Sequence, residues 1–166
     1  MTTQRIAFPS SPWLRLGLLT LTAATALCLT PPARAESMAW TATSYGVSQD
    51  RTTGQFTRRG LALFPNGEVA AFTLQGQVTA FDPKAMQFDA KIVYTFEDGS
   101  TLRQEGSGRT EFTAPPRNVQ QGKGRLVGGT GRFEGISGTT ESSGRSITET
   151  DSVTFYQAEF TLPPRK

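Results

Sequence analysis

The chain has no histidine and one cysteine, Cys28, which lies near the N-terminus. Serine–histidine and cysteine–histidine catalysis both need a histidine, which the chain does not have. Zinc sites built from histidine and cysteine are excluded as well, and one cysteine cannot form an intramolecular disulfide. Any chemistry must therefore use carboxylates, tyrosine, arginine, lysine, hydroxyls or amides, and we expect no metal and no other cofactor.

Long hydrophobic runs are also scarce, and the clearest one covers residues 16–30 (LGLLTLTAATALCLT). It is shorter than the roughly 20 apolar residues that a membrane-spanning helix needs. Basic residues precede it, and the PPARA that follows ends in the small-x-small pattern of a signal-peptidase site, Ala33 to Ala35. The sequence therefore predicts a signal peptide over residues 1–35, cleaved after Ala35, and export to the periplasm or the extracellular medium. An uncleaved anchor is the alternative.

Residues 36–166, which follow the predicted signal peptide, have no excess of positive charge. The whole chain has 17 Lys and Arg against 14 Asp and Glu, but Arg5, Arg15 and Arg34 lie in the signal segment and no acidic residue does. Residues 36–166 therefore carry 14 charges of each sign. A nucleic-acid binder needs clustered positive charge to neutralise phosphates. The densest basic stretch, TRR at 57–59, is interpreted as a solvated turn, and no nucleic-acid partner is expected.

Alternation with a period of two is the clearest pattern that the chain does have. In residues 86–96 (MQFDAKIVYTF) every second side chain is apolar or aromatic, from Met86 to Phe96, and most of the others are polar. This pattern is typical of a strand with one buried face. Further strands are expected over 37–46 and 152–162.

The strand over residues 86–96 is expected to continue into a hairpin, and the pairing of side chains across it indicates the length of the loop. A two-residue loop would place Ile92 opposite Glu105, which puts a charge against the apolar face. A three-residue loop over 97–99 places Ile92 opposite Gln104, which keeps charges off the apolar face. The choice matters because a shift of one residue in strand pairing turns every side chain of a strand to the other face. We therefore predict the three-residue loop, with Gly99 in the left-handed conformation.

The strand count indicates the fold class. Two strands joined at Pro65-Asn66-Gly67 precede the hairpin, and TAPPRN (113–118) is expected to be a loop. Seven or eight antiparallel strands with short turns indicate a closed barrel or a sandwich. The sequence predicts one all-β domain over residues 36–166, without a linker or a repeat.

The glycine-rich stretch RLVGGTGRFEG (125–135) admits two interpretations. A dinucleotide-binding loop would need a helix to begin there, with the pyrophosphate held at its N-terminus. The residues that follow, ISGTTESSGRS, have no apolar helical stripe, and the glycine spacing misses GxGxxG by one residue. The sequence therefore favours a corner between strands.

GGTGRFEGISGT (128–139), together with YTFEDGSTL (94–102), resembles the allene oxide cyclase and dirigent barrel family over roughly residues 38–162. The resemblance implies a single antiparallel, calycin-like β-barrel of about eight strands. It implies that the glycine loop joins two strands and tucks its aromatic side chain onto the barrel. The residues expected to build this structural loop are Gly128, Gly129, Gly131 and Phe133.

The family's activities imply a small-molecule function. Its cyclases enclose an unstable fatty-acid epoxide, and its dirigent proteins steer the coupling of phenoxy radicals. The resemblance therefore implies a small hydrophobic or aromatic ligand in the barrel interior. Three functions stay open: a binding protein, a cyclase, isomerase or dirigent-like protein that imposes a conformation on a reactive substrate, and a filled barrel that acts through its surface. A homotrimer is also implied, with a monomer as the alternative.

Candidate ligand-binding residues are those on inner strand faces that carry a large ring or a polar group. A buried tyrosine hydroxyl or amide needs a hydrogen-bond partner, which a ligand or the core could supply. Glu149 and Asp151 lie two apart and could divide acid and base roles, although a hydrated outer face also explains them. The sequence identifies no catalytic residue. The ligand-binding candidates are Phe72, Tyr94, Gln104 and Tyr156.

Overall fold

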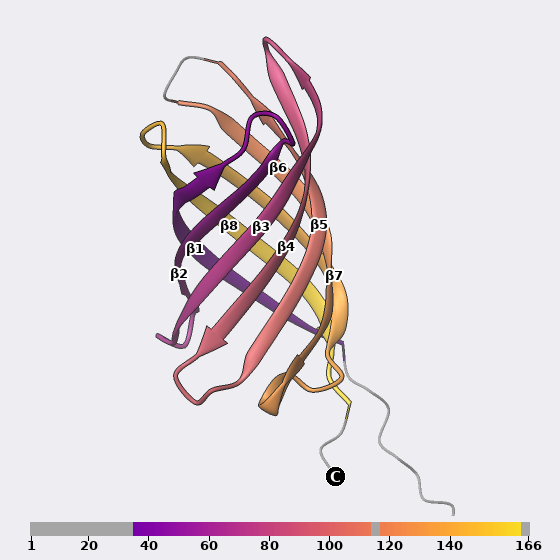
Figure 1. Ribbon diagram of the computed structural model, residues 1–166. Coiled ribbons are helices and arrows are strands. Elements are labelled where there is room, and N and C mark those ends of the chain that lie inside the picture. Colours follow the sequence, from indigo (N-terminus) through magenta and orange to yellow (C-terminus); the bar gives the residue numbers. More distant parts are fainter. Residues whose placement is uncertain (1–34, 114–116, 164–166) are drawn as a thin grey trace, which may run out of the picture. The chain divides into compact units, whose positions relative to one another are not determined.

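The computed structural model describes residues 35–113 and 117–163, which form a closed antiparallel barrel of eight strands (Figure 1). The strands are β1 (Ala35–Gln49), β2 (Gln55–Leu63), β3 (Val69–Asp82), β4 (Ala85–Phe96), β5 (Thr101–Glu111), β6 (Val119–Thr130), β7 (Ser137–Ser146) and β8 (Asp151–Thr161). Each strand pairs with its neighbours in sequence, and β1 pairs with β8 to close the sheet. The predicted all-β barrel of about eight strands is confirmed.

Two predicted segments fall wholly or partly outside the described residues. The predicted signal peptide lies there except for Ala35, the first residue of β1. Residues 114–116 of the predicted loop over 113–118 lie there as well.

The β4–β5 hairpin has the predicted register. Ile92 pairs with Gln104, and the Phe96 N–H donates a hydrogen bond to the Ser100 carbonyl at 2.9 Å. Gly99 has a φ of 78°, the left-handed conformation that the three-residue loop requires. This register points Ile92 and Gln104 into the barrel, where both are buried.

The barrel is filled with side chains at one end. This is the end at which the β2–β3 and β4–β5 turns lie, the lower end in Figure 1. The aromatic side chains there contact one another, since Trp40 stacks on Phe64 and Phe64 packs against Phe96. Burying each such side chain contributes about 1.5–3 kcal/mol to folding. The larger members of this core are Trp40, Phe64, Phe72, Tyr94, Phe96, Leu102, Leu126, Phe133, Ile136, Tyr156 and Phe160.

The glycine-rich stretch turns a corner at this filled end. Gly131–Phe133 forms a single 3-10 turn, η1, and a short link through Gly135 leads to strand β7 at Ser137. Gly128 and Gly131 have φ values of 118° and 60°, which other residues rarely adopt. Phe133 is buried, with its ring centroid 4.8 Å from that of Phe96.

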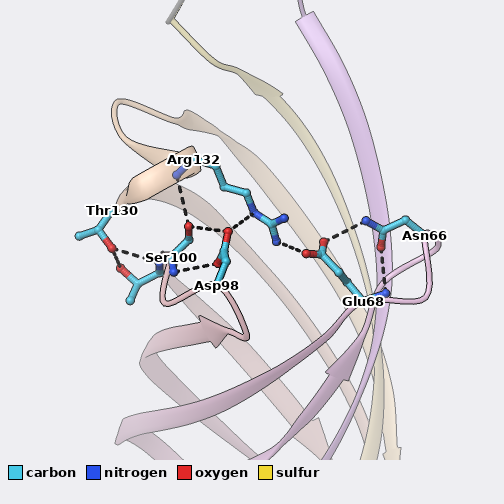
Figure 2. A network of polar contacts seen from close by, with 7 residues as sticks. Asn66, Glu68, Asp98, Ser100, Thr130 and Arg132 are labelled. Atoms are coloured by element: carbon cyan, nitrogen blue, oxygen red, sulfur yellow. Dashed lines mark hydrogen bonds and ion pairs between the residues drawn. The ribbon is translucent and has the colours of Figure 1, made fainter.

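Arg132 joins three loops across the filled end, as Figure 2 shows. Its guanidinium forms ion pairs with Glu68 after the β2–β3 turn and with Asp98 in the β4–β5 turn. The same group lies over the ring of Phe96, 4.6 Å from its centroid. The Arg132 backbone N–H donates to the Ser100 hydroxyl at 3.3 Å. These contacts cover the aromatic core with a polar lid, so the filled end is sealed.

The outer surface of the barrel is divided between apolar and charged strands. Outward side chains of β1, β2, β3 and β8 include five exposed apolar residues: Tyr45, Leu61, Leu63, Val69 and Phe155. Leu63 and Val69 are direct cross-strand partners, and Thr41 of β1 separates Leu63 from Phe155. Outward side chains of β4 to β7 instead form exposed ion pairs, such as Lys91 with Glu105 and Lys123 with Glu141. Such exposed pairs contribute little to stability.

Candidate functional site

The other half of the barrel interior is open. A cavity of about 60 Å³ lies directly above the core, and a mouth of about 290 Å³ lies beyond it. The mouth is bordered by the last residues of β1 and by Glu149 and Thr150 of the β7–β8 turn. This is the upper end of the barrel in Figure 1. Four side chains line both spaces and so form the boundary between them: Arg58, Leu74, Phe88 and Gln120.

Small residues on the inner faces of β5, β6 and β7 leave room for this cavity. Gly106, Gly122 and Ser142 all line it. At Gly106 the strands themselves approach closely, because an added Cβ would lie 2.7 Å from the Cα of Gly124 on β6. At Gly108 the space is taken by a ring, because an added Cβ would overlap Phe88. Glycine therefore allows both the tight curvature of these strands and the inward position of Phe88.

Arg58 is a cation inside this open half. Its Nε donates to the Ser44 hydroxyl at 3.0 Å. Its Nη2 donates to the Thr150 carbonyl at 2.6 Å, to the Ser152 hydroxyl at 3.1 Å and to the Ser44 carbonyl at 3.3 Å. Strand β2 places it there, because Phe56, Arg58 and Ala62 share the inner face. The guanidinium is thus held in one orientation by β1 and by the β7–β8 hairpin.

The charge of Arg58 is not paired with a carboxylate. Within residues 35–113 and 117–163, no Asp or Glu oxygen lies within 4.0 Å of its guanidinium. Burial lowers the pKa of Arg58, while the charge of Asp151 partly offsets that effect. An arginine stays protonated in proteins even so. Among the described residues, the hydrogen bonds of this positive charge therefore all go to neutral oxygen atoms.

A chain of hydrogen bonds separates the core from the cavity. Trp40 Nε1 donates to the Tyr94 hydroxyl at 3.3 Å, and that hydroxyl donates to Gln104 Oε1 at 3.3 Å. Gln104 Nε2 in turn donates to the Thr140 hydroxyl at 3.0 Å. Burial raises the pKa of Tyr94 well above its usual range. The partners that the Tyr94 hydroxyl and the Gln104 amide need are thus supplied by the protein itself.

The four predicted ligand-binding residues occupy two levels of the barrel. Phe72, Gln104 and Tyr156 line the inner cavity, and all three are largely buried. Tyr94 is fully buried and belongs to the filled half. Burial raises the pKa of Tyr156 to about 12, although the Tyr94 hydroxyl and the Arg58 charge act in the opposite direction. Contact of these residues with a ligand stays a prediction.

Arg58 was not among the predicted site residues, and the interpretation of residues 57–59 as a solvated turn is wrong. These residues lie in the middle of β2, with Arg58 directed inward and Arg59 exposed. The alternation of Phe56, Arg58, Gly60 and Ala62 was the available signal, because it places Arg58 in the apolar register. The two adjacent arginines, Arg58 and Arg59, favoured a solvated turn over this strand pattern.

A larger depression of about 870 Å³ lies across strands β2 to β6. Its lining is mainly polar and charged, and it includes the exposed pair Lys91 and Glu105. A small ligand is better held by a concave, mostly apolar space with few polar groups. The interior cavity fits that description better, although it is smaller.

The described part of the chain has neither a metal-binding cluster nor a membrane-spanning helix. No group of three or more histidine, cysteine, aspartate or glutamate side chains is placed there to hold a metal ion. Among the same residues, no helix has the length and apolar character needed to cross a membrane.

Comparison with known proteins identifies the fold. Protein-family profiles gave no match, and neither did a comparison with curated proteins. Among solved structures, the pterocarpan synthase dirigent protein GePTS1 aligns with a TM-score of 0.54 at 14% sequence identity, covering 80% of this chain and 88% of that one. The pterocarpan synthase dirigent protein PsPTS1 aligns with a TM-score of 0.51 at 13% identity, covering 82% and 99%. The chain therefore has the β-barrel fold of the dirigent proteins.

Proposed function

We propose that the protein binds a small hydrophobic or aromatic molecule in the open half of the barrel. The observation that carries this proposal is the internal division of the barrel, with a sealed aromatic core at one end and a cavity with a mouth at the other. Leu74 and Phe88 offer apolar surface, while Arg58 and Gln120 offer a few polar groups. That combination is typical of small-molecule sites.

The size of the space limits the ligand. Ligand pockets usually measure about 300–1,000 Å³, and the cavity and mouth together are near the lower end of that range. The filled core stops a ligand from passing through the barrel, because Trp40, Tyr94 and Leu102 occupy the interior below. The ligand is therefore compact and enters from the mouth.

A blocking substitution tests the proposal. Ala90 lines the inner cavity, and Ala90→Trp would place an indole in that space. We expect the purified wild-type protein to retain or take up one small molecule in native mass spectrometry, and Ala90→Trp to lose it. Ala80→Trp, at an exposed position on β3, is the matched control and should behave as the wild type. Equal retention by both variants would instead favour a filled barrel that acts through its surface.

A dirigent-like or isomerase-like activity is the second candidate. Its support is the structural similarity to two pterocarpan synthase dirigent proteins. A barrel that holds a reactive substrate in one conformation lowers the barrier without a strong acid or base. This candidate predicts that the protein changes the stereochemical composition of the products formed from a reactive precursor, whereas a binding protein would only retain the precursor.

We also propose that the protein is exported and cleaved after Ala35. The chemistry of residues 1–35 supports this proposal, and cleavage there would leave every buried side chain of β1 in place, because Trp40 is the first of them. Intact-mass analysis of the exported protein should give residues 36–166. A mass that retains the first 35 residues would favour the uncleaved anchor.

Assembly into a homotrimer remains a proposal, with the apolar outer strands as its support. Leu61 and Leu63 on β2 are more than half exposed, and Phe155 on β8 is 53% exposed. Exposed apolar patches of this kind often mark contacts between proteins. Light scattering should give three times the monomer mass, and Leu61→Lys should reduce it. A monomeric wild-type protein would overturn the proposal.

A further inference from the structure

The open half contains a fixed cation and no matching anion, and this constrains the chemistry of what binds there. We propose that the ligand is a compact aromatic carboxylate, with its carboxylate on Arg58 and its ring against Phe56, Leu74 and Phe88. This inference rests on the proposed binding function and specifies the class of ligand.

The charge of Arg58 favours an anionic partner. Its hydrogen-bond acceptors are two serine hydroxyls and two backbone carbonyls, all of them neutral. Removing a cation from water costs free energy that neutral acceptors repay only in part. A carboxylate placed beside it would gain a charge-assisted hydrogen bond of the stronger kind. The site is therefore better matched to an anion than to a neutral molecule.

The orientation of the guanidinium leaves one of its nitrogens available. Nε and Nη2 are occupied by Ser44, Thr150 and Ser152, whereas Nη1 makes no hydrogen bond with any described residue. Arg58 lines both the inner cavity and the mouth. Because the other two nitrogens are already fixed, Nη1 is preorganised to donate to a ligand oxygen.

Two neutral groups complete the polar side of this site. Tyr156 and Gln120 both line the inner cavity with Arg58. At neutral pH the Tyr156 hydroxyl is protonated, as an ordinary tyrosine is, and burial raises its pKa further, to about 12. A protonated phenol and a primary amide both donate hydrogen bonds, and an ionised carboxylate accepts them.

Two carboxylates lie near the rim, and the charge of Asp151 acts on Arg58 from a distance without a direct ion pair. Asp151 accepts a hydrogen bond from the Thr148 hydroxyl at 2.6 Å, which holds it within the β7–β8 turn. Glu149 borders the mouth and is exposed. Neither forms an ion pair with Arg58 among the contacts of the described residues.

The aromatic part of the proposal follows from the apolar side chains beside Arg58, since Leu74 is its direct cross-strand partner and Phe56 lies two residues before it on the same face of β2. Phe56 and Phe88 contact edge to face at the mouth, with ring centroids 5.8 Å apart and planes at 82°. Leu74 lines the same space. Aromatic rings pack favourably in such edge-to-face groups. A flat ring fits against these side chains, and the sealed core leaves no channel for a long alkyl chain.

The test compares a charged probe with a neutral one of the same shape. We would titrate the purified protein with 2-naphthoate and with 2-naphthamide by isothermal titration calorimetry. The carboxylate should bind at least about tenfold more tightly, because its negative charge pairs with the guanidinium, whereas the amide oxygen is a neutral acceptor. Arg58→Gln should remove that preference while leaving the affinity for the amide nearly unchanged.

Arg59→Gln is the matched control, since it removes the same charge from the outer face of the same strand. It should keep the preference for naphthoate. Equal losses in the two variants would mean that naphthoate responds to overall charge, which overturns the proposal. Near-ultraviolet circular dichroism checks that each variant keeps its aromatic core.

The wild-type titration separates this inference from the function on which it rests. Equal affinity for naphthoate and naphthamide, with both abolished by Ala90→Trp, would overturn the carboxylate proposal and leave interior binding standing. Binding of neither probe would count against both. Because this comparison uses the unmodified protein, it decides the question even if Arg58→Gln fails to fold.

Discussion

Trp40 and Tyr156 stack face to face, with ring centroids 5.0 Å apart and ring planes within 4° of parallel. They are direct partners in the β1–β8 pairing that closes the barrel. Both belong to the aromatic core, and Tyr156 also lines the cavity above it. This stack is therefore both part of the barrel closure and part of the cavity floor.

Loss of the stack should cost stability. Tyr156→Leu removes one ring of the pair, and we expect the free energy of unfolding to fall by about 2–4 kcal/mol. Tyr156→Phe keeps the ring and should cost less than about 1.5 kcal/mol. Urea unfolding measures both values. The near-ultraviolet circular dichroism of Trp40 should change in the leucine variant and persist in the phenylalanine variant; the reverse result would contradict this role.

Alkaline pH should destabilise the barrel through the same residue. The pKa of Tyr156 is raised from 10.0 to about 12 in the folded protein, chiefly by burial. A group with a raised pKa stabilises the fold below its unfolded pKa, and that contribution is lost as the pH rises through its folded pKa. The free energy of unfolding should therefore fall between about pH 10 and pH 12. Tyr156→Phe should show a shallower fall; an unchanged slope would assign the effect to other groups.

Gly131 should tolerate substitution less well than Gly99, although both have a positive φ. An added Cβ at Gly99 would meet nothing within 4 Å, whereas one at Gly131 would overlap the Ser100 side chain. Gly99→Ala should cost about 1 kcal/mol from backbone strain alone, and Gly131→Ala should cost more. Thermal unfolding of the two variants makes the comparison. Equal melting temperatures would mean that Ser100 moves aside freely.

Arg132 should stabilise the sealed end of the barrel. Arg132→Gln removes a cation that lies 4.6 Å from the Phe96 ring centroid and 4.9 Å from that of Phe133. We expect a loss of about 1–2 kcal/mol in the free energy of unfolding from these cation–π contacts. Arg59→Gln is the control, because Arg59 is exposed on the outer face. Equal effects of the two substitutions would contradict the sealing role.

The same loop cluster should produce acid sensitivity. The Ser100 backbone N–H lowers the pKa of Asp98, and the Asn66 amide, followed by Arg132, lowers that of Glu68. A carboxyl with a lowered pKa stabilises the fold above its unfolded pKa, and that contribution is lost as the pH falls through its folded pKa. The melting temperature should therefore fall below about pH 4. Asn66→Ala should make that fall shallower, and an unchanged profile would exclude Glu68 as a contributor.

Local pattern was enough to predict the β4–β5 hairpin and its register. Residues 86–96 alternate regularly, and a slip of one position would have placed Glu105 against Ile92, so the β4–β5 pairing followed from chemistry alone. Gly99 and Gly67 marked turns because a positive φ is easy for glycine. Periodicity and turn chemistry act over a few residues, which is why sequence reasoning reached them.

The candidate site was only partly accessible from the sequence. Phe72, Gln104 and Tyr156 were found because their strands alternate clearly, and all three line the cavity. Arg58 was missed because the alternation of apolar and polar residues in β2 is weak, and the adjacent Arg59 made an exposed turn the preferred interpretation. Its partners Ser44 and Ser152 lie 108 residues apart in the chain, and their hydroxyls are 2.9 Å apart. No local pattern connects them.

The sequence by itself determined the class of fold, the inward face of several strands and the position of several turns, because these depend on side-chain alternation and on glycine geometry. Only the tertiary structure decided which half of the interior is filled and which is open. That outcome depends on how rings and glycines from eight strands meet across the barrel. Close packing of this kind is a property of distant residues brought together, so the cavity and its arginine emerge only when the barrel closes.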